Sequence, residues 1–272
     1  MNRAVRIFVF LACVWALIPV VWCGLASLKS SEELARIPGT LLPADFTLQH
    51  YIELFTRRPF AAYYLNSLVV SSLSAFLCVA AAGLASYRLA RSPKRFRSAV
   101  SSSLLVMAFF PPIVLLFPVY EIVRMFGLVN QPWGLILPYA ALNLPFAIWL
   151  LTGYMELIPY ELEEAAAVDG LGPFDIFRRI VAPLAMPAMT SAFLLVFIFS
   201  WNEFMFALTF MNLESSRTLT AGMATLSGAF SQEIPWGLLA AGVMASTIPL
   251  ILAVFVFQKK IVAGLTAGGI KE

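Results

Sequence analysis

Six long apolar runs constrain the fold of this chain more than any other feature of its sequence. The runs occupy residues 7–27, 64–86, 98–123, 133–157, 188–210 and 236–258. A helix rises about 1.5 Å per residue, so about 20 apolar residues cross the roughly 30 Å hydrocarbon core of a bilayer. Each run meets that length. The sequence therefore predicts an all-α membrane protein, in which residues 1–272 form a single transmembrane domain with six crossings.

The composition agrees with a lipid environment. Hydrophobic residues make up 61% of the chain and charged residues only 12%, whereas a soluble domain carries about 25% charged residues. The net charge of +3 gives no indication of nucleic-acid binding. The three cysteines lie inside apolar runs, and the only histidine, His50, has no neighbouring ligands, so we expect no metal site. The first run is longer than the core of a signal peptide (about 7–15 residues) and is interpreted as a retained helix.

The distribution of lysine and arginine predicts how the chain lies in the membrane. If the N-terminus is cytoplasmic, twelve of the 18 basic residues fall on the inner side and six on the outer side. Basic residues favour cytoplasmic loops. The short segment 87–97 is the sharpest case, with five basic residues and no acidic one. We therefore predict a multi-pass protein with both termini in the cytoplasm, together with the loop 158–187.

The loop between the fourth and fifth runs is built from helix-forming residues. A first helix is predicted over residues 160–170, because carboxylates crowd its first turns and Gly170 can adopt the left-handed conformation that ends a helix. Pro173 suits the start of a second helix. Pro183 and Pro187 are expected to end that helix and to begin the fifth crossing.

Small side chains give the first of these helices a narrow face. Leu162, Ala165, Ala166 and Asp169 recur at the spacing of one helical stripe. An amphipathic helix resting on the membrane is the alternative, but alanines supply little membrane affinity. A narrow face fits deeply into a protein groove. The loop is therefore predicted to be a docking surface for another protein.

The same loop resembles the EAA motif of bacterial ATP-binding-cassette (ABC) importer permeases. That motif reads EAA, three residues, Gly, nine residues, Ile, one residue, Leu and Pro. The matching residues are Glu164, Ala165, Ala166, Gly170, Ile180 and Pro183. Ala182 stands where the motif has leucine. Segments 66–68, 145–149, 201–204 and 264–268 are similar, in the same order, to the carbohydrate-uptake branch. Within that branch the chain resembles the second, shorter permease, the type of the maltose importer's smaller membrane subunit.

The resemblance implies a type I ABC importer permease of the bacterial inner membrane, with a cytoplasmic coupling helix in contact with ATPase subunits. The implied partners are membrane lipid, a second homologous permease in a heterodimer, two ATPase subunits that bind ATP and Mg, and an extracytoplasmic binding protein that delivers a sugar or sugar derivative. The chain contains no G-x-x-x-x-G-K-[ST] sequence, so we expect no cofactor and no catalysis of its own. The residues implied to couple to the ATPase are Glu163, Glu164, Ala165, Ala166, Asp169, Gly170 and Pro183.

Polar residues inside the spans are the candidates for contact with the transported substrate. Glu203 is the one clear ionisable group within a run, and such groups are costly in a membrane. It stands beside Trp201 and Asn202, and a carboxylate, an aromatic ring and an amide together suit a sugar. Glu203 could equally pair with the partner permease or cap a neighbouring helix. Asn143 and Tyr139 in the fourth run are further candidates for the pathway, although Asn143 could also join two helices.

Prolines predict a bend in the third run. Pro111, Pro112 and Pro118 fall within residues 98–123. Proline removes a helical hydrogen bond and clashes with the preceding turn. The bend could serve as a gating hinge or only as a packing feature.

Three other functions are compatible with parts of this pattern. An ion-coupled secondary transporter would use the crossings and the intramembrane carboxylate, but such proteins often contain internal repeats, and no convincing repeat is visible here. A membrane scaffold would need only the spans and the docking loop. An intramembrane enzyme would need a catalytic constellation, which the sequence does not offer. The secondary transporter is the main alternative to an ABC permease.

Overall fold

Long helices dominate the structure. The computed structural model describes residues 3–36, 39–226 and 235–269, with side chains described up to residue 256. Five segments in this part of the chain are long and apolar enough to cross a membrane. They are α1 (Arg3–Ser27), α4 (Phe60–Ala90), α7 (Trp133–Met155), the segment Pro173–Asn202 and the described part of α13 (Trp236–Gly269). A bent pair, α5 (Lys94–Ala108) and α6 (Pro112–Met125), would supply a sixth span. The predicted all-α membrane fold is confirmed.

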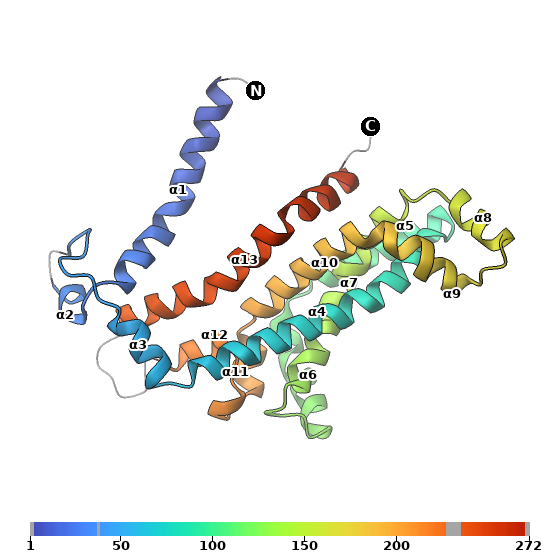
Figure 1. The fold of residues 1–272 in the computed structure, drawn as a ribbon. Helices are drawn as coiled ribbons and strands as arrows, with labels where there is room; N and C mark the ends of the chain where they lie inside the picture. The colour runs from blue at the N-terminus through green and yellow to red at the C-terminus, as the bar shows by residue number, and fades with distance from the viewer. Residues whose placement is uncertain (1–2, 37–38, 227–234, 270–272) are drawn as a thin grey trace.

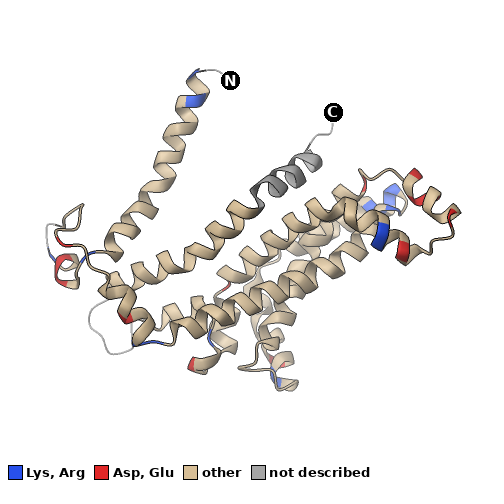
Figure 2. Cartoon of the chain, viewed as in Figure 1, with Lys and Arg blue, Asp and Glu red and all other residues tan. Residues whose placement is uncertain are grey.

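The short helices lie at the ends of the long ones. They are α2 (Ser31–Leu34), α3 (Gln49–Thr56), α8 (Glu161–Val168), α11 (Met205–Phe210), η2 (Glu214–Ser216) and α12 (Leu219–Ala224). The hairpin containing α8 lies at the end of the bundle opposite to α3, α11 and α12 (Figure 1). Acidic and basic residues concentrate at these two ends, and the middle of the long helices is almost free of them (Figure 2). This distribution leaves an apolar band of the kind that a bilayer requires.

The helix α4 packs against α7 and α10 (Ala182–Asn202) and forms the centre of the bundle. Many of its buried side chains are small and recur about once per turn. They include Ser67, Ser71, Ala75, Cys78, Ala82 and Ser86. Small side chains let neighbouring helices approach closely, which is how helices gain packing energy in lipid. In contrast, α1 contacts the first part of α13 near its own C-terminal end. Towards its N-terminus, α1 diverges from the bundle (Figure 1).

The third predicted crossing, residues 98–123, is not one helix. α5 ends at Ala108, α6 begins at Pro112, and the two helices are bent by 86°. Pro111 and Pro112 donate no backbone hydrogen bond, and the residue before a proline avoids helical conformation, so the helix cannot continue through this point. Pro118 lies inside α6 without ending it. The predicted bend is confirmed, whereas the prediction of a single run of helix was wrong.

The fifth predicted crossing, residues 188–210, was wrong at both ends. α9 (Pro173–Ile176), η1 (Phe177–Val181) and α10 form one segment that passes through both prolines expected to break it. In η1 the chain makes a π-turn, in which the Ala182 amide donates to the Phe177 carbonyl. This wider turn immediately precedes Pro183. Proline has no backbone amide hydrogen, so Pro183 cannot donate a hydrogen bond to a carbonyl one turn earlier. At the other end, helix α10 stops at Asn202.

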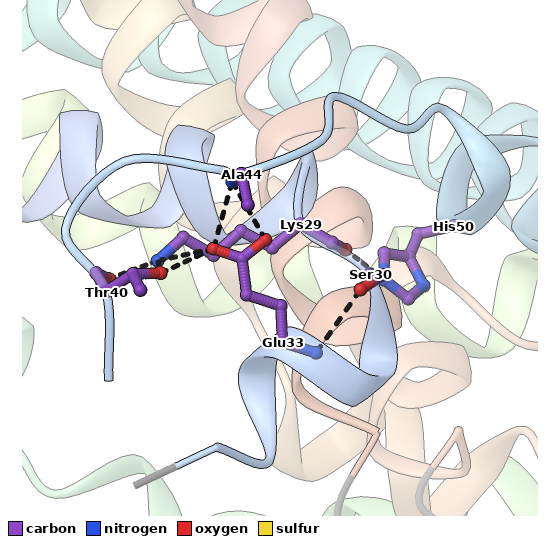
Figure 3. Close-up of polar contacts among 6 residues, drawn as sticks. All are labelled: Lys29, Ser30, Glu33, Thr40, Ala44 and His50. Atoms are coloured by element: carbon purple, nitrogen blue, oxygen red, sulfur yellow. Dashed lines mark hydrogen bonds and ion pairs between the residues drawn. The ribbon is translucent and has the colours of Figure 1, made fainter. Parts of the chain in front are cut away.

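A polar cluster holds the segment between α1 and α3 (Figure 3). The Glu33 carboxylate accepts hydrogen bonds from the Thr40 hydroxyl and from the Ala44 amide, the latter at 3.1 Å. The Thr40 hydrogen bond lowers the pKa of Glu33. His50 donates from Nε2 to the carbonyl oxygen of Lys29 at 2.9 Å and is buried. His50 therefore has a structural position between the end of α1 and the start of α3.

Candidate functional site

The sequence of α8 explains where this helix begins and ends. Its first turn carries Glu161, Glu163 and Glu164. Carboxylates in this position complement the positive end of the helix. Gly170 follows the helix with φ of +85°, a conformation that glycine adopts without strain. The Gly170 amide donates to the Ala167 carbonyl at 3.0 Å. The Leu171 amide donates to the Ala166 carbonyl at 3.1 Å, which completes a Schellman motif. The predicted helix end at Gly170 is confirmed.

The helix α8 has two different faces. Glu163 and Ala166 point inward, and each is only 5% exposed. Glu164, Ala165 and Asp169 are exposed, as are Gly170 and Pro183 beyond them. The stripe predicted to contain both alanines is therefore split between the two faces. Five of the seven residues implied to couple to the ATPase lie on the surface, and two are covered by the chain itself.

A buried ion pair fixes the inward face. Arg91, at the C-terminal end of α4, places Nη2 at 2.5 Å from Glu163 Oε1. The Tyr87 hydroxyl donates to Glu163 Oε2 at 2.9 Å. Sequence reasoning missed both partners, because it counted Arg91 only among the basic residues that set orientation. The position of this arginine at the end of a span, one turn after Tyr87, was the available signal.

The outward face of the hairpin also carries large apolar side chains. Val168 is 88% exposed, and Tyr160, Leu162 and Phe174 are exposed as well. Val168 was not among the residues that the sequence singled out. Apolar side chains at this end lie beside exposed carboxylates, a mixture typical of a protein interface rather than of a lipid-facing surface.

A cavity of about 420 Å³ lies near the other end of the bundle, between the two breaks in the long helices. Residues on both sides of these breaks line it, among them Ala108 and Pro112 from the α5–α6 bend. It brings together Tyr139, Asn143, Asn202 and Glu203. Four of the five residues predicted for the substrate pathway are thus neighbours in space.

Glu203 connects the elements around the cavity. It is extended rather than helical, and it follows α10 directly. Its carboxylate accepts hydrogen bonds from the Phe206 amide at 2.9 Å and from the Ala207 amide at 3.1 Å. These are first-turn amides of α11, which have no partner inside the helix. The carboxylate also accepts a hydrogen bond from the Tyr139 hydroxyl. Glu203 therefore caps a neighbouring helix while it lines the cavity.

The other predicted pathway residues differ in position. Trp201 is 3% exposed and packs in the main core, stacked on Phe197 at 5.6 Å between ring centroids, so it does not line the cavity. Asn143 donates to the carbonyl of Tyr139, one turn earlier on its own helix, at 2.8 Å. Sequence reasoning missed Ser200, which also lines the cavity. Its hydroxyl is buried and has no hydrogen-bond partner within the described part of the chain.

Comparison with known proteins shows which family model and which relatives match this chain. The family model for the binding-protein-dependent transport system inner membrane component matches residues 79–266. The chain is 36% identical to the sulfoquinovosyl glycerol transport system permease protein SmoH of Agrobacterium fabrum, over 94% of this chain and 89% of that protein. It is 36% identical to the trehalose transport system permease protein SugB of Mycobacterium tuberculosis, over 94% of this chain and 93% of that protein.

One solved structure is similar over nearly the whole length. It is a bacterial ABC transporter involved in the import of the acidic polysaccharide alginate, with a TM-score of 0.77 and 23% sequence identity. The match covers 95% of this chain and 98% of the other. At this identity the likeness concerns the fold alone.

Proposed function

The chain belongs to the family of binding-protein-dependent transport system inner membrane components, and on this premise we propose that it is the permease through which an ATP-driven importer passes a sugar or sugar derivative. The observation that carries the proposal is the α8 hairpin. Its outward face exposes carboxylates, small residues and large apolar side chains at one end of the apolar band. Such a face is suited to a protein partner that sits on the membrane surface.

The hairpin is the proposed contact with the ATPase subunits. Ala165 leaves room for a close approach, and Glu164 and Asp169 offer carboxylates on the same exposed side. ATP binding and hydrolysis would take place on the partner subunits, and this chain would receive only the movement. A partner can shift the conformation of the permease only if it contacts the hairpin differently in the two states. We propose that Glu164, Ala165, Asp169 and Gly170 make those contacts.

The cavity beside Glu203 is the proposed path of the substrate. The residues that line it include Tyr139, Ser200, Asn202 and Glu203, whose side chains carry hydroxyl, amide and carboxylate groups. Such groups can exchange hydrogen bonds with the hydroxyls of a sugar. The names of the relatives support this substrate class, since they specify sulfoquinovosyl glycerol for one and trehalose for another.

The remaining partners follow from the arrangement of the two ends. We propose that the hairpin faces the cytoplasm of a bacterial cell, in line with the distribution of basic residues. A binding protein would then deliver the substrate at the opposite end, near α3 and α11. A structurally similar transporter was crystallised with a substrate-bound periplasmic protein, which supports a binding protein as a partner. We further propose a second, homologous permease as the partner within the membrane.

Reconstitution of the complete importer in proteoliposomes tests this function. Trehalose, maltose and sulfoquinovosyl glycerol serve as probes, and uptake is measured with and without ATP on the side of the ATPase subunits. Glu164→Lys reverses a charge on the docking face, and Gly170→Pro forbids the φ of +85° that ends α8. We expect either change to leave membrane insertion intact and to reduce ATP-driven uptake at least about tenfold, the loss that about 1.4 kcal/mol of contact energy would cause.

The control is Glu121→Lys, the same charge reversal at an exposed position on α6. It should leave uptake unchanged. Normal uptake by Glu164→Lys would contradict the assignment of the docking face. Uptake that follows a proton gradient and ignores ATP would instead identify an ion-coupled secondary transporter.

A further inference from the structure

The guanidinium group of Arg91 joins three elements at the inner end of the bundle. Its Nε donates to Glu163 Oε1 at 2.7 Å, which attaches the end of α4 to α8. Its Nη1 donates to the Met155 carbonyl at 3.2 Å, and its Nη2 donates to the Ile158 carbonyl at 3.1 Å. The two carbonyls belong to the end of α7 and the residues just after it. A single side chain therefore links α4, α7 and α8.

Arg91 donates to two carbonyl groups where α7 ends: that of Met155, which also accepts from the Ile158 amide at 3.3 Å, and that of Ile158, just beyond the helix. The last carbonyls of α7 have no amide to accept from within the helix. The planar guanidinium reaches these two carbonyls and the Glu163 carboxylate together, a geometry that a lysine could not reproduce. The ring of Tyr160, the residue before α8, lies 5.8 Å from the guanidinium carbon. The residues that connect α7 to α8 thus contact the Arg91 side chain through the Ile158 carbonyl and the Tyr160 ring.

Apolar packing surrounds this connection. Tyr87, Met155, Ile158, Ala166 and Ile176 belong to one buried cluster, to which α4, α7, α8 and α9 all contribute. The ring of Tyr87 also contacts Phe177 in η1, with 5.4 Å between centroids. Its hydroxyl donates to Glu163. The inward face of α8 therefore makes both hydrophobic and charged contacts, and Glu163 is buried among them.

We propose that Glu163 is a positioning residue which, with Arg91 and Tyr87, fixes the coupling helix to the ends of α4 and α7. Its carboxylate is engaged within the chain and does not meet the ATPase, whereas that of the adjacent Glu164 is exposed. Movement of the hairpin therefore passes directly into two helices of the bundle, one of which, α7, carries the cavity residues Tyr139 and Asn143. This inference rests on the proposed function of the hairpin.

Replacement of Glu163 by glutamine tests the proposal, because it removes the charge and keeps the size. In the complete importer we expect the ATPase subunits to remain bound and ATP hydrolysis to continue. Uptake of trehalose, maltose or sulfoquinovosyl glycerol per ATP hydrolysed should fall about tenfold, the factor that corresponds to one charge-assisted hydrogen bond. Tyr87→Phe removes one neutral donor and keeps the ion pair, so it should lower the same ratio about threefold.

The matched control is Glu156→Gln. Glu156 forms an ion pair with Arg97 at 3.1 Å at the same end of the bundle, and this pair ties α5 to α7 without contacting α8. Its loss should leave the ratio unchanged. If Glu163→Gln instead releases the ATPase subunits, Glu163 is a docking residue and the proposal fails. An unchanged ratio in both Glu163→Gln and Tyr87→Phe also overturns it.

Two further outcomes separate the proposal from its premise. If Glu163→Gln fails to insert, Tyr87→Phe decides, because that variant leaves no buried charge without a partner. If the wild-type importer shows no ATP-driven uptake, the proposed function fails, whatever the variants do. A defect confined to the ratio of uptake to hydrolysis would not arise from misfolding alone, since a misfolded permease loses both together.

Discussion

Glu163 and Glu203 are two glutamates that drew attention in the sequence, and the structure places them in opposite chemical settings. Glu163 pairs with Arg91 within 2.5 Å and is enclosed by apolar side chains. Glu203 accepts hydrogen bonds from two backbone amides and from the Tyr139 hydroxyl. No ion pair to Glu203 is found in the described part of the chain.

The difference indicates what each region of the molecule has to do. An ion pair with additional hydrogen bonds joins three helix ends tightly, and it exposes almost no charge to a partner. Neutral donors hold the other carboxylate in place and leave it on the wall of a cavity. The first region joins helix ends, and the second forms part of the wall of a cavity.

Loss of Arg91 should produce the largest effect. Arg91→Met leaves the Glu163 carboxylate buried with the Tyr87 hydroxyl as its main partner, and breaking a buried pair in this way costs about 3–5 kcal/mol. Thermal unfolding of the purified importer measures this cost. The double variant Arg91→Met with Glu163→Leu should recover much of the stability, because a buried ion pair can be replaced by apolar side chains. Equal destabilisation by the single and double variants would show that the two residues are not energetically coupled.

Replacement of Glu203 should produce an intermediate effect. Glu203→Gln keeps the shape but replaces one acceptor oxygen with an amide group, so that one of its two α11 backbone amides loses its partner. We expect a loss of about 1–2 kcal/mol in unfolding free energy, as for other helix caps. Thermal unfolding checks this value, and uptake kinetics with trehalose check the cavity. Unchanged stability together with altered uptake would mean that Glu203 acts on the substrate alone.

Replacement of Ser200 should produce the smallest change in stability. Among the described residues its buried hydroxyl has no hydrogen-bond partner, so Ser200→Ala should alter the unfolding free energy by less than about 1 kcal/mol. The concentration of trehalose at half-maximal uptake should rise about threefold if the hydroxyl meets the sugar, as one neutral hydrogen bond would predict. Ser71, on α4, is the matched control, because its hydroxyl is equally buried, also has no partner in the part of the chain that the structure describes, and lies outside the cavity lining. Similar uptake by both alanine variants would contradict a role for Ser200.

The sequence predicted the elements that depend on local chemistry. The apolar runs located the spans, Gly170 marked the end of α8, and prolines marked the bend between α5 and α6. It did not predict the π-turn that carries the chain through Pro183, where η1 contacts α8 and Phe177 packs on Tyr87 of α4, since the latter contact joins residues far apart in the sequence. Arg91 and Glu163 are 72 residues apart, and no local pattern shows that they meet. Burial of Trp201 likewise results from long-range packing.

The uninterrupted passage of the chain through Pro183 has a mechanical consequence. The segment Pro173–Asn202 contains 30 residues, which at about 1.5 Å per residue gives a rod of about 45 Å, some 15 Å longer than the hydrocarbon core. One tip of the rod belongs to the hairpin, and the other borders the cavity. If the segment moves as one body, a tilt of about 5° around its midpoint carries both tips about 2 Å in opposite directions. A small push on the hairpin would thus reposition Ser200 and Asn202 without any change in their own helix.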